Sequence, residues 1–143
     1  MADNNNDMLC KLKRAFELKE VDIKTYSPLS LAFIGDSVYD LIVRSIVVCK
    51  GNTSNNNLHK NSVKYVSAVS QAKIIEAVKP ILTEEELNIY KRGKNAKPHS
   101  GAKNATKNEY LKATGFEALI GYLYLKGETD RIIEIVLKGI KDE

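Results

Sequence analysis

The stretch Pro28–Cys49, which reads PLSLAFIGDSVYDLIVRSIVVC, decides the fold of this chain. Ser27 before Pro28 is a typical helix start and Gly51 a typical stop, so the stretch predicts one long helix. Because it is apolar over nearly its whole length, we expect this helix at the centre of the fold. Asp36 lies in its middle. A carboxylate there is either solvated at the helix edge or paired with a metal ion, an arginine or a hydrogen-bond cage.

A second apolar stretch with a single carboxylate occupies residues 113–125, ATGFEALIGYLYL, and its acid is Glu117. Two central helices that each carry an acid among apolar residues indicate that the two carboxylates meet. Gly115 and Gly121 would let another helix or a substrate backbone approach closely. Together, the two stretches have more apolar surface than the other, shorter helices can cover, which predicts a dimer formed through both of them.

The composition is that of one globular domain. The chain has 143 residues, of which 43% are hydrophobic and 28% are charged. Its apolar runs are too short to span a membrane, and its polar N-terminus lacks the pattern of a signal peptide. Cys10 and Cys49 are expected to be buried, reduced thiols, and no group of His and Cys residues has the spacing of a zinc site. We therefore expect a cytoplasmic protein.

Helical periodicity covers the rest of the chain, and no segment shows the alternation of a strand. Beside the two central helices, we expect helices over residues 8–20, from residue 58 onward, and over residues 72–78, 83–91 and 129–140. Thr83 and Glu86 have the spacing of a capping box at the start of one of them. The predicted architecture is all-α, with residues 1–20 as an N-terminal tail and helix and residues 21–143 as the main domain.

Residues 91–107, KRGKNAKPHSGAKNATK, are the most unusual stretch by composition. They include six of the 22 basic residues and no acid, which leaves 16 basic against 18 acidic residues elsewhere. We expect a loop here, because the stretch contains glycine and proline. Its charge is either a solvated surface or a contact for a nucleic-acid backbone, which lysine and arginine bind without reading sequence. The absence of aromatic residues favours duplex contact over the stacking of single-stranded bases.

Two motifs and the stretch between them resemble the ribonuclease III family. Residues 31–40, LAFIGDSVYD, resemble its signature helix, and residues 112–125, KATGFEALIGYLYL, resemble its second acidic helix. Residues 92–97, RGKNAK, and the short segments around Leu58 and Gln71 are similar to Mini-ribonuclease III, a bacterial form made of the catalytic domain alone. The resemblance extends from about Val21 to the C-terminus.

The resemblance implies a homodimeric all-α domain that hydrolyses phosphodiesters in double-stranded RNA with Mg²⁺, leaving 5′-phosphate and 3′-hydroxyl ends. It places Asp36 and Glu117 on the metal-binding carboxylates of the family. We expect Thr114 to reach the metal through a water molecule. The residues expected to hold the RNA backbone are His59, Arg92, Lys94 and Lys97.

The chain also departs from full-length members of the family. Those proteins carry two further glutamates in the first motif, where this chain has Leu29 and Ala32, and an aspartate where it has Thr114. Two acids therefore remain, which leaves the number of metal ions open. We expect no double-stranded-RNA-binding domain after Glu143, and we therefore expect affinity to come from the catalytic domain or from a partner. The resemblance implies precursor 23S ribosomal RNA as the substrate, with a large-subunit ribosomal protein on that RNA as a further partner.

Two functions of other classes are also compatible with the residues. A non-catalytic helical protein that binds RNA or the ribosome would keep the basic stretch and use Asp36 and Glu117 only structurally. A helical interaction protein would use the basic stretch only as a solvated tether. A nuclease assay on duplex RNA, with and without Mg²⁺, separates these alternatives from the enzyme.

Overall fold

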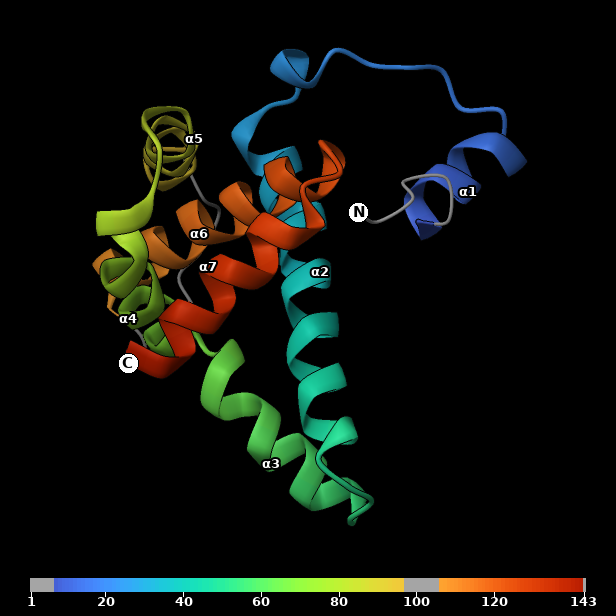
Figure 1. The fold of residues 1–143 in the computed structure, drawn as a ribbon. Helices are drawn as coiled ribbons and strands as arrows, with labels where there is room; N and C mark the ends of the chain where they lie inside the picture. Colours follow the sequence, from blue (N-terminus) through green and yellow to red (C-terminus); the bar gives the residue numbers. More distant parts are fainter. Residues whose placement is uncertain (1–6, 97–105, 143) are drawn as a thin grey trace.

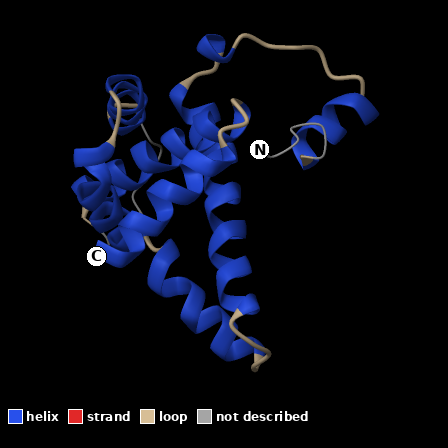
Figure 2. Cartoon of the chain, viewed as in Figure 1, coloured by secondary structure: helices blue, strands red, loops and turns tan. Residues whose placement is uncertain are grey.

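The computed structural model describes residues 7–96 and 106–142 (Figure 1). Its regular elements are helical and these two ranges contain no strand, so the all-α prediction is confirmed (Figure 2). The helices are α1 (Met8–Ala15), α2 (Pro28–Cys49), α3 (Asn55–Val66), α4 (Ala68–Val78), α5 (Glu84–Lys94), α6 (Lys107–Leu125) and α7 (Thr129–Asp142). Two 3-10 turns, η2 (Ile23–Thr25) and η3 (Lys79–Ile81), lie in the connections.

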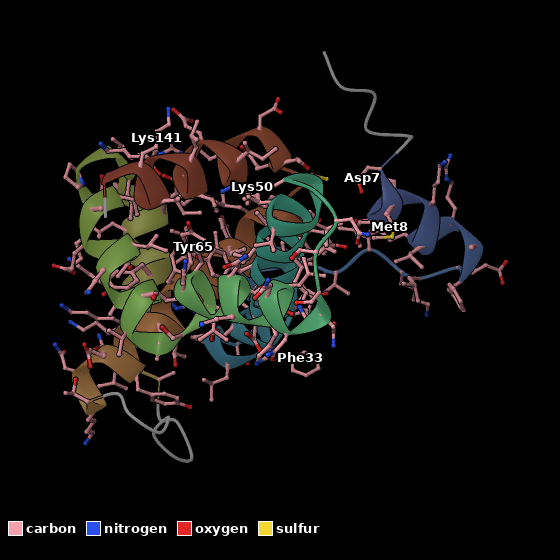
Figure 3. All side chains as sticks on the ribbon, turned by 90° about the horizontal axis from the view of Figure 1, so that it is seen from below. Asp7, Met8, Phe33, Lys50, Tyr65 and Lys141 are labelled. Atoms are coloured by element: carbon pink, nitrogen blue, oxygen red, sulfur yellow. The ribbon has the colours of Figure 1, made fainter. Side chains whose placement is uncertain are left out.

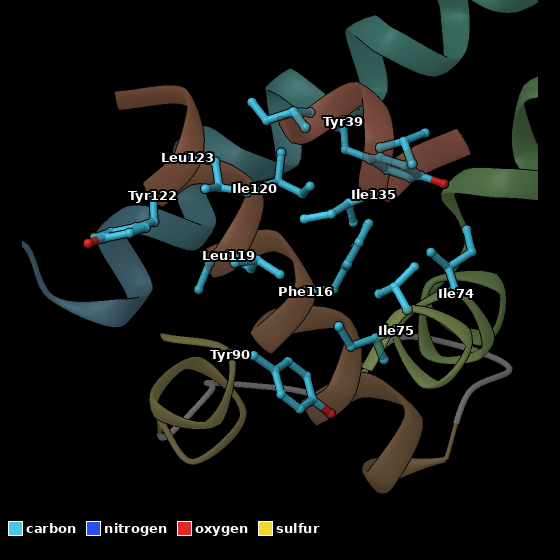
Figure 4. Close-up of a cluster of buried hydrophobic side chains, with 14 of the residues drawn as sticks. Tyr39, Ile74, Ile75, Tyr90, Phe116, Leu119, Ile120, Tyr122, Leu123 and Ile135 are labelled. Carbon is cyan, nitrogen blue, oxygen red and sulfur yellow. The ribbon is translucent and has the colours of Figure 1, made fainter. Parts of the chain in front are cut away.

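Helix α6 is the central element, and α2, α4, α5 and α7 pack against it (Figure 1). From Ala113 to Leu123, every residue except Glu117 is buried. Figure 4 shows Phe116 of α6 in the middle of the core. Its ring packs edge-on against the ring of Tyr39, with the two ring centroids 5.1 Å apart. The chain therefore covers the apolar surface of α6 itself, and the prediction that this helix also forms a dimer interface is wrong.

Helix α2 begins and ends where the sequence predicts, but one of its faces is open to solvent. Ser27 is the N-cap, and Gly51 follows the helix with a φ of +135°, which favours glycine. The open face carries the exposed apolar side chains of Leu29, Phe33, Leu41 and Val48. Phe33 is 80% exposed and projects away from the helical body in Figure 3. The expectation that this helix is buried on nearly all sides is therefore wrong for a single chain.

The other helix boundaries follow local capping signals. The capping box of Thr83 and Glu86 is present at the start of α5, as predicted, and a second one opens α6. Helix α1 ends at Ala15, earlier than expected, and lies apart from the helical body in Figure 1. Cys49 is exposed, so the prediction that it is buried is wrong, although both cysteines are free thiols. Within the described ranges, none of the helices has the length and apolar character needed to cross a membrane.

Candidate active site

The backbones of α2 and α6 are in direct contact where they cross, and two glycines permit this. A Cβ atom on Gly35 would lie 1.7 Å from the carbonyl oxygen of Glu117, and one on Gly121 would lie 1.9 Å from that of Leu31. A side chain at either position would therefore force the helices apart. Asp36 follows Gly35 directly, so this crossing brings the two acid-bearing turns together. The expected close approach of another helix at Gly121 is confirmed.

The carboxyl groups of Asp36 and Glu117 meet beside the crossing, as the sequence predicts. Asp36 is exposed, whereas Glu117 is partly buried. Burial, then the negative charge of Asp36 and a hydrogen bond with it, raise the pKa of Glu117 to about 8. In the absence of a cation, Glu117 is thus mostly protonated at neutral pH. A positive charge bound nearby would favour the ionised form of Glu117 and so lower its pKa.

Gln71 of α4 is a third side chain at this site, although its sequence context does not mark it as a site residue. It is buried, with 2% of its surface exposed. Its amide nitrogen donates to the Val66 carbonyl oxygen at 3.0 Å and to Glu117 Oε2 at 3.4 Å. The second bond lowers the pKa of Glu117 and so opposes part of the effect of burial. The signal available in the sequence was a lone amide in a largely apolar helix, which does not reveal a partner 46 positions away.

Thr114 lies one turn before Glu117 on α6 and is buried. Its hydroxyl donates to the Tyr110 carbonyl oxygen at 3.1 Å, within the same helix. The hydroxyl proton is therefore used, and the oxygen keeps lone pairs with which it can accept a hydrogen bond from a water molecule.

The oxygen atoms of this cluster fit a hard divalent cation. Carboxylate oxygens are preferred ligands of Mg²⁺, which needs one or two of them beside water and substrate oxygens. Gln71 Oε1 is buried and has no hydrogen-bond partner among the described residues, so it can accept from a water molecule on such an ion. Across residues 7–96 and 106–142, no group of three or more His, Cys, Asp and Glu residues could hold a metal ion. A cation would therefore rely on the two acids together with water or substrate.

The predicted basic loop begins later than expected. Arg92 and Lys94 belong to the last turn of α5, where positive charges interact favourably with the helix C-terminus. Between them, Gly93 packs directly on α6, since a Cβ there would lie 2.7 Å from that of Ala118. The α5–α6 contact thus fixes the helical backbone of Arg92, whose side chain is exposed, and of Lys94, whose side chain is half-buried. Lys97 lies outside the described residues.

His59 is separated from the two acids. It is exposed on α3 and lines a surface hollow with Arg44 and Val48, which belong to the C-terminal half of α2. These residues follow Asp36 by eight and twelve positions, or about 12–18 Å along the helix. The structure therefore does not bring His59 next to Asp36 and Glu117.

Comparisons with known proteins agree with this arrangement. The profile of the Ribonuclease III domain matches residues 29–128. The Mini-ribonuclease 3 of Brevibacillus brevis is 54% identical over 110 residues, which cover 77% of this chain and 82% of that protein. The Mini-ribonuclease 3 of Clostridium tetani is 43% identical over 121 residues, which cover 84% of this chain and 80% of that protein. A crystal structure of a protein from Fusobacterium nucleatum matches with a TM-score of 0.77 and 34% identity, covering 86% of this chain and 98% of that one. The chain therefore belongs to the ribonuclease III family, and within it to the Mini-ribonuclease 3 group.

Proposed function

We propose that this chain is a Mg²⁺-dependent endoribonuclease that cleaves double-stranded RNA. Its catalytic and metal-binding residues are Asp36 and Glu117. As a member of its family the chain is a double-strand-specific endoribonuclease. The observation that carries the residue assignment is the α2–α6 crossing. It places two carboxyl groups side by side, one of them with its pKa raised to about 8. Perturbed acids of this kind are typical of functional sites.

Asp36 and Glu117 would hold the cation between α2 and α6. When bound, Mg²⁺ lowers the pKa of a coordinated water, which can then act as the nucleophile, and neutralises charge that develops on the phosphate. Asp36 is exposed, so a substrate can reach it, while Glu117 is anchored deeper by α6 and Gln71. Because Glu117 holds a proton near neutral pH, cation binding must displace this proton and should strengthen as the pH rises. The hydroxyl oxygen of Thr114 would accept a hydrogen bond from a water molecule on this cation.

Arg92, Lys94 and Lys97 would hold the phosphate backbone beside the acids. The first two lie at the end of α5, which packs on the α6 segment that carries Glu117. His59 would make a separate contact further along the duplex, since it lies on α3 near the far end of α2. Such contacts position the RNA and do not read its sequence.

The protein would act as a homodimer through the open face of α2. This face carries four exposed apolar side chains, led by Phe33, and exposed apolar surface of this kind typically marks an interface. A symmetric pair would present two active sites on one particle. Both strands of a duplex could then be cut in one binding event.

The natural substrate that we propose is precursor 23S ribosomal RNA in the cytoplasm, with a large-subunit ribosomal protein as a partner on that RNA. This part rests on the similarity to the Mini-ribonuclease 3 proteins.

The test compares duplex RNA, single-stranded RNA and a precursor 23S transcript, each with Mg²⁺ or with EDTA. We expect cleavage of the duplex and of the precursor in Mg²⁺ only, with 5′-phosphate ends. Duplex binding without cleavage would instead identify a non-catalytic RNA-binding protein. If duplex RNA is neither bound nor cut, the chain is an interaction protein and the proposal is wrong.

A further inference from the structure

The buried carboxamide of Gln71 lies next to Glu117, one of the two proposed metal ligands, and its oxygen has no partner in the described part of the chain. Gln71 is 2% exposed, and its Oε1 atom has no hydrogen-bond partner among the described residues. A buried acceptor without a partner is destabilising, so a group that donates to it would remove this cost.

The contacts of Gln71 fix the direction of its amide. Its nitrogen lies 3.0 Å from the Val66 carbonyl oxygen and 3.4 Å from Glu117 Oε2. Both neighbours are oxygen acceptors, so the atom that contacts them is the NH₂ nitrogen, and the amide oxygen is the atom left without a partner. Val66 ends α3 and Gln71 lies in the following helix, which holds the carboxamide rigidly across this junction. The unpaired oxygen shares its carbon atom with the nitrogen that contacts Glu117, so it belongs to the same site.

We propose that Gln71 is a positioning residue of this active site. Its nitrogen holds one oxygen of Glu117, and its oxygen accepts a hydrogen bond from a water molecule on the cation that Asp36 and Glu117 bind. This inference rests on the proposed function, because it requires a cation at these two acids. Groups that orient metal ligands in this way typically contribute about 10- to 100-fold to metal affinity. In a site with two carboxylates, a neutral group that orders a metal-bound water also helps to define the position of the cation.

The test measures Mn²⁺ binding to the RNA-free protein by electron paramagnetic resonance, since Mn²⁺ takes the same oxygen ligands as Mg²⁺. Gln71→Met nearly keeps the side-chain volume and removes both the donor and the acceptor. Ser70→Ala is the matched control, because Ser70 Oγ donates to the Lys64 carbonyl oxygen at 2.5 Å across the same α3–α4 junction. We expect the Mn²⁺ dissociation constant to rise about tenfold or more in Gln71→Met and to stay unchanged in Ser70→Ala.

Duplex cleavage gives a second readout of the same variants. Gln71→Met should need a higher Mg²⁺ concentration for half-maximal cleavage, while its rate at saturating Mg²⁺ should fall less. Equal Mn²⁺ affinity in the wild type and Gln71→Met would overturn the inference. Equal losses in Gln71→Met and Ser70→Ala would also overturn it, because the effect would then come from the helix junction.

Asp36→Asn distinguishes a failure of this inference from a failure of the proposed function. If Asp36→Asn binds Mn²⁺ like the wild type, the cation is not at these acids and both proposals are wrong. If Asp36→Asn loses Mn²⁺ while Gln71→Met retains it, only the assignment of Gln71 is wrong.

A measurement on the wild type makes the test independent of how Gln71→Met folds. The side-chain NH₂ signals of Gln71 can be assigned in NMR spectra through their proximity to Val66 and followed during a Mg²⁺ titration. We expect both signals to shift over the Mg²⁺ range that activates cleavage, and to stay in place in Asp36→Asn. Signals that do not move in the wild type over this range would overturn the inference.

Discussion

Replacing Glu117 by Gln should stabilise the metal-free protein, by an amount that grows with pH. Gln has nearly the same shape as protonated Glu but cannot ionise. The pKa of Glu117 is raised from its usual value of 4.5 to about 8 in the folded chain, chiefly by burial and further by Asp36. In the unfolded chain this carboxyl group titrates at its usual pKa. The wild type therefore has its full stability below about pH 4.5 and loses stability as the pH rises toward about 8.

The structure sets the size of this effect. Each pH unit between the two pKa values lowers the unfolding free energy of the wild type by at most about 1.4 kcal/mol. The loss is therefore about 3 kcal/mol at pH 7 and about 4–5 kcal/mol above pH 8. Glu117 retains some contact with solvent, which lowers these values. At pH 8.5 we expect the unfolding free energy of Glu117→Gln to exceed that of the wild type by about 2–4 kcal/mol. At pH 5 the two proteins should differ by less than about 1 kcal/mol.

The assay is urea unfolding, followed by circular dichroism at pH 5 and pH 8.5 in EDTA. Asp36→Asn is an informative companion variant, because it removes the charge that contributes to the raised pKa of Glu117 but leaves the burial unchanged. Its stability should fall less with pH than that of the wild type. Added Mg²⁺ should stabilise the wild type and have little effect on Glu117→Gln. If the difference in unfolding free energy between the wild type and Glu117→Gln is the same at both pH values, the reasoning is refuted. It is also refuted if Glu117→Gln is less stable than the wild type at pH 8.5.

Three other predictions concern the helix crossing, the dimer and the RNA contacts. Gly121→Ala should lower the unfolding free energy by about 1–3 kcal/mol, because its Cβ would lie 1.9 Å from a carbonyl oxygen of α2; an unchanged urea midpoint would count against the close crossing. Phe33→Glu should give a monomer by light scattering, since it places a charge on the open apolar face of α2; a retained dimer would exclude that face. Replacing Arg92, Lys94 and Lys97 together by alanine should lower the slope of log affinity against log salt by about two to three. An unchanged slope would move the RNA contacts to another surface.

Much of the fold is encoded in short-range signals. The start of α2 at Ser27 and Pro28 and the capping box of Thr83 and Glu86 depend on residues within one turn, so both could be read directly from the sequence. The meeting of Asp36 and Glu117 was also predictable, because a carboxylate in an apolar helix requires a partner.

Features that depend on tertiary packing could not be predicted in this way. The sequences of α2 and α6 are similarly apolar, and apolarity alone does not show that α6 is covered by its own chain while one face of α2 is open. Gly93 indicated a loop, because glycine weakens a helix, but its close packing on α6 keeps it inside α5. The contact of Gln71 with Glu117 depends on how α4 packs against α6, which no local pattern encodes.

The most direct test of the central claim is single-turnover cleavage of duplex RNA by Asp36→Asn in saturating Mg²⁺, with duplex binding measured on the same sample. Asp36 is exposed, so the substitution should leave the fold intact, and removing its negative charge should not weaken RNA binding. The account predicts that Asp36→Asn binds the duplex at least as tightly as the wild type and does not cleave it above background. Cleavage at a rate near that of the wild type would contradict the account.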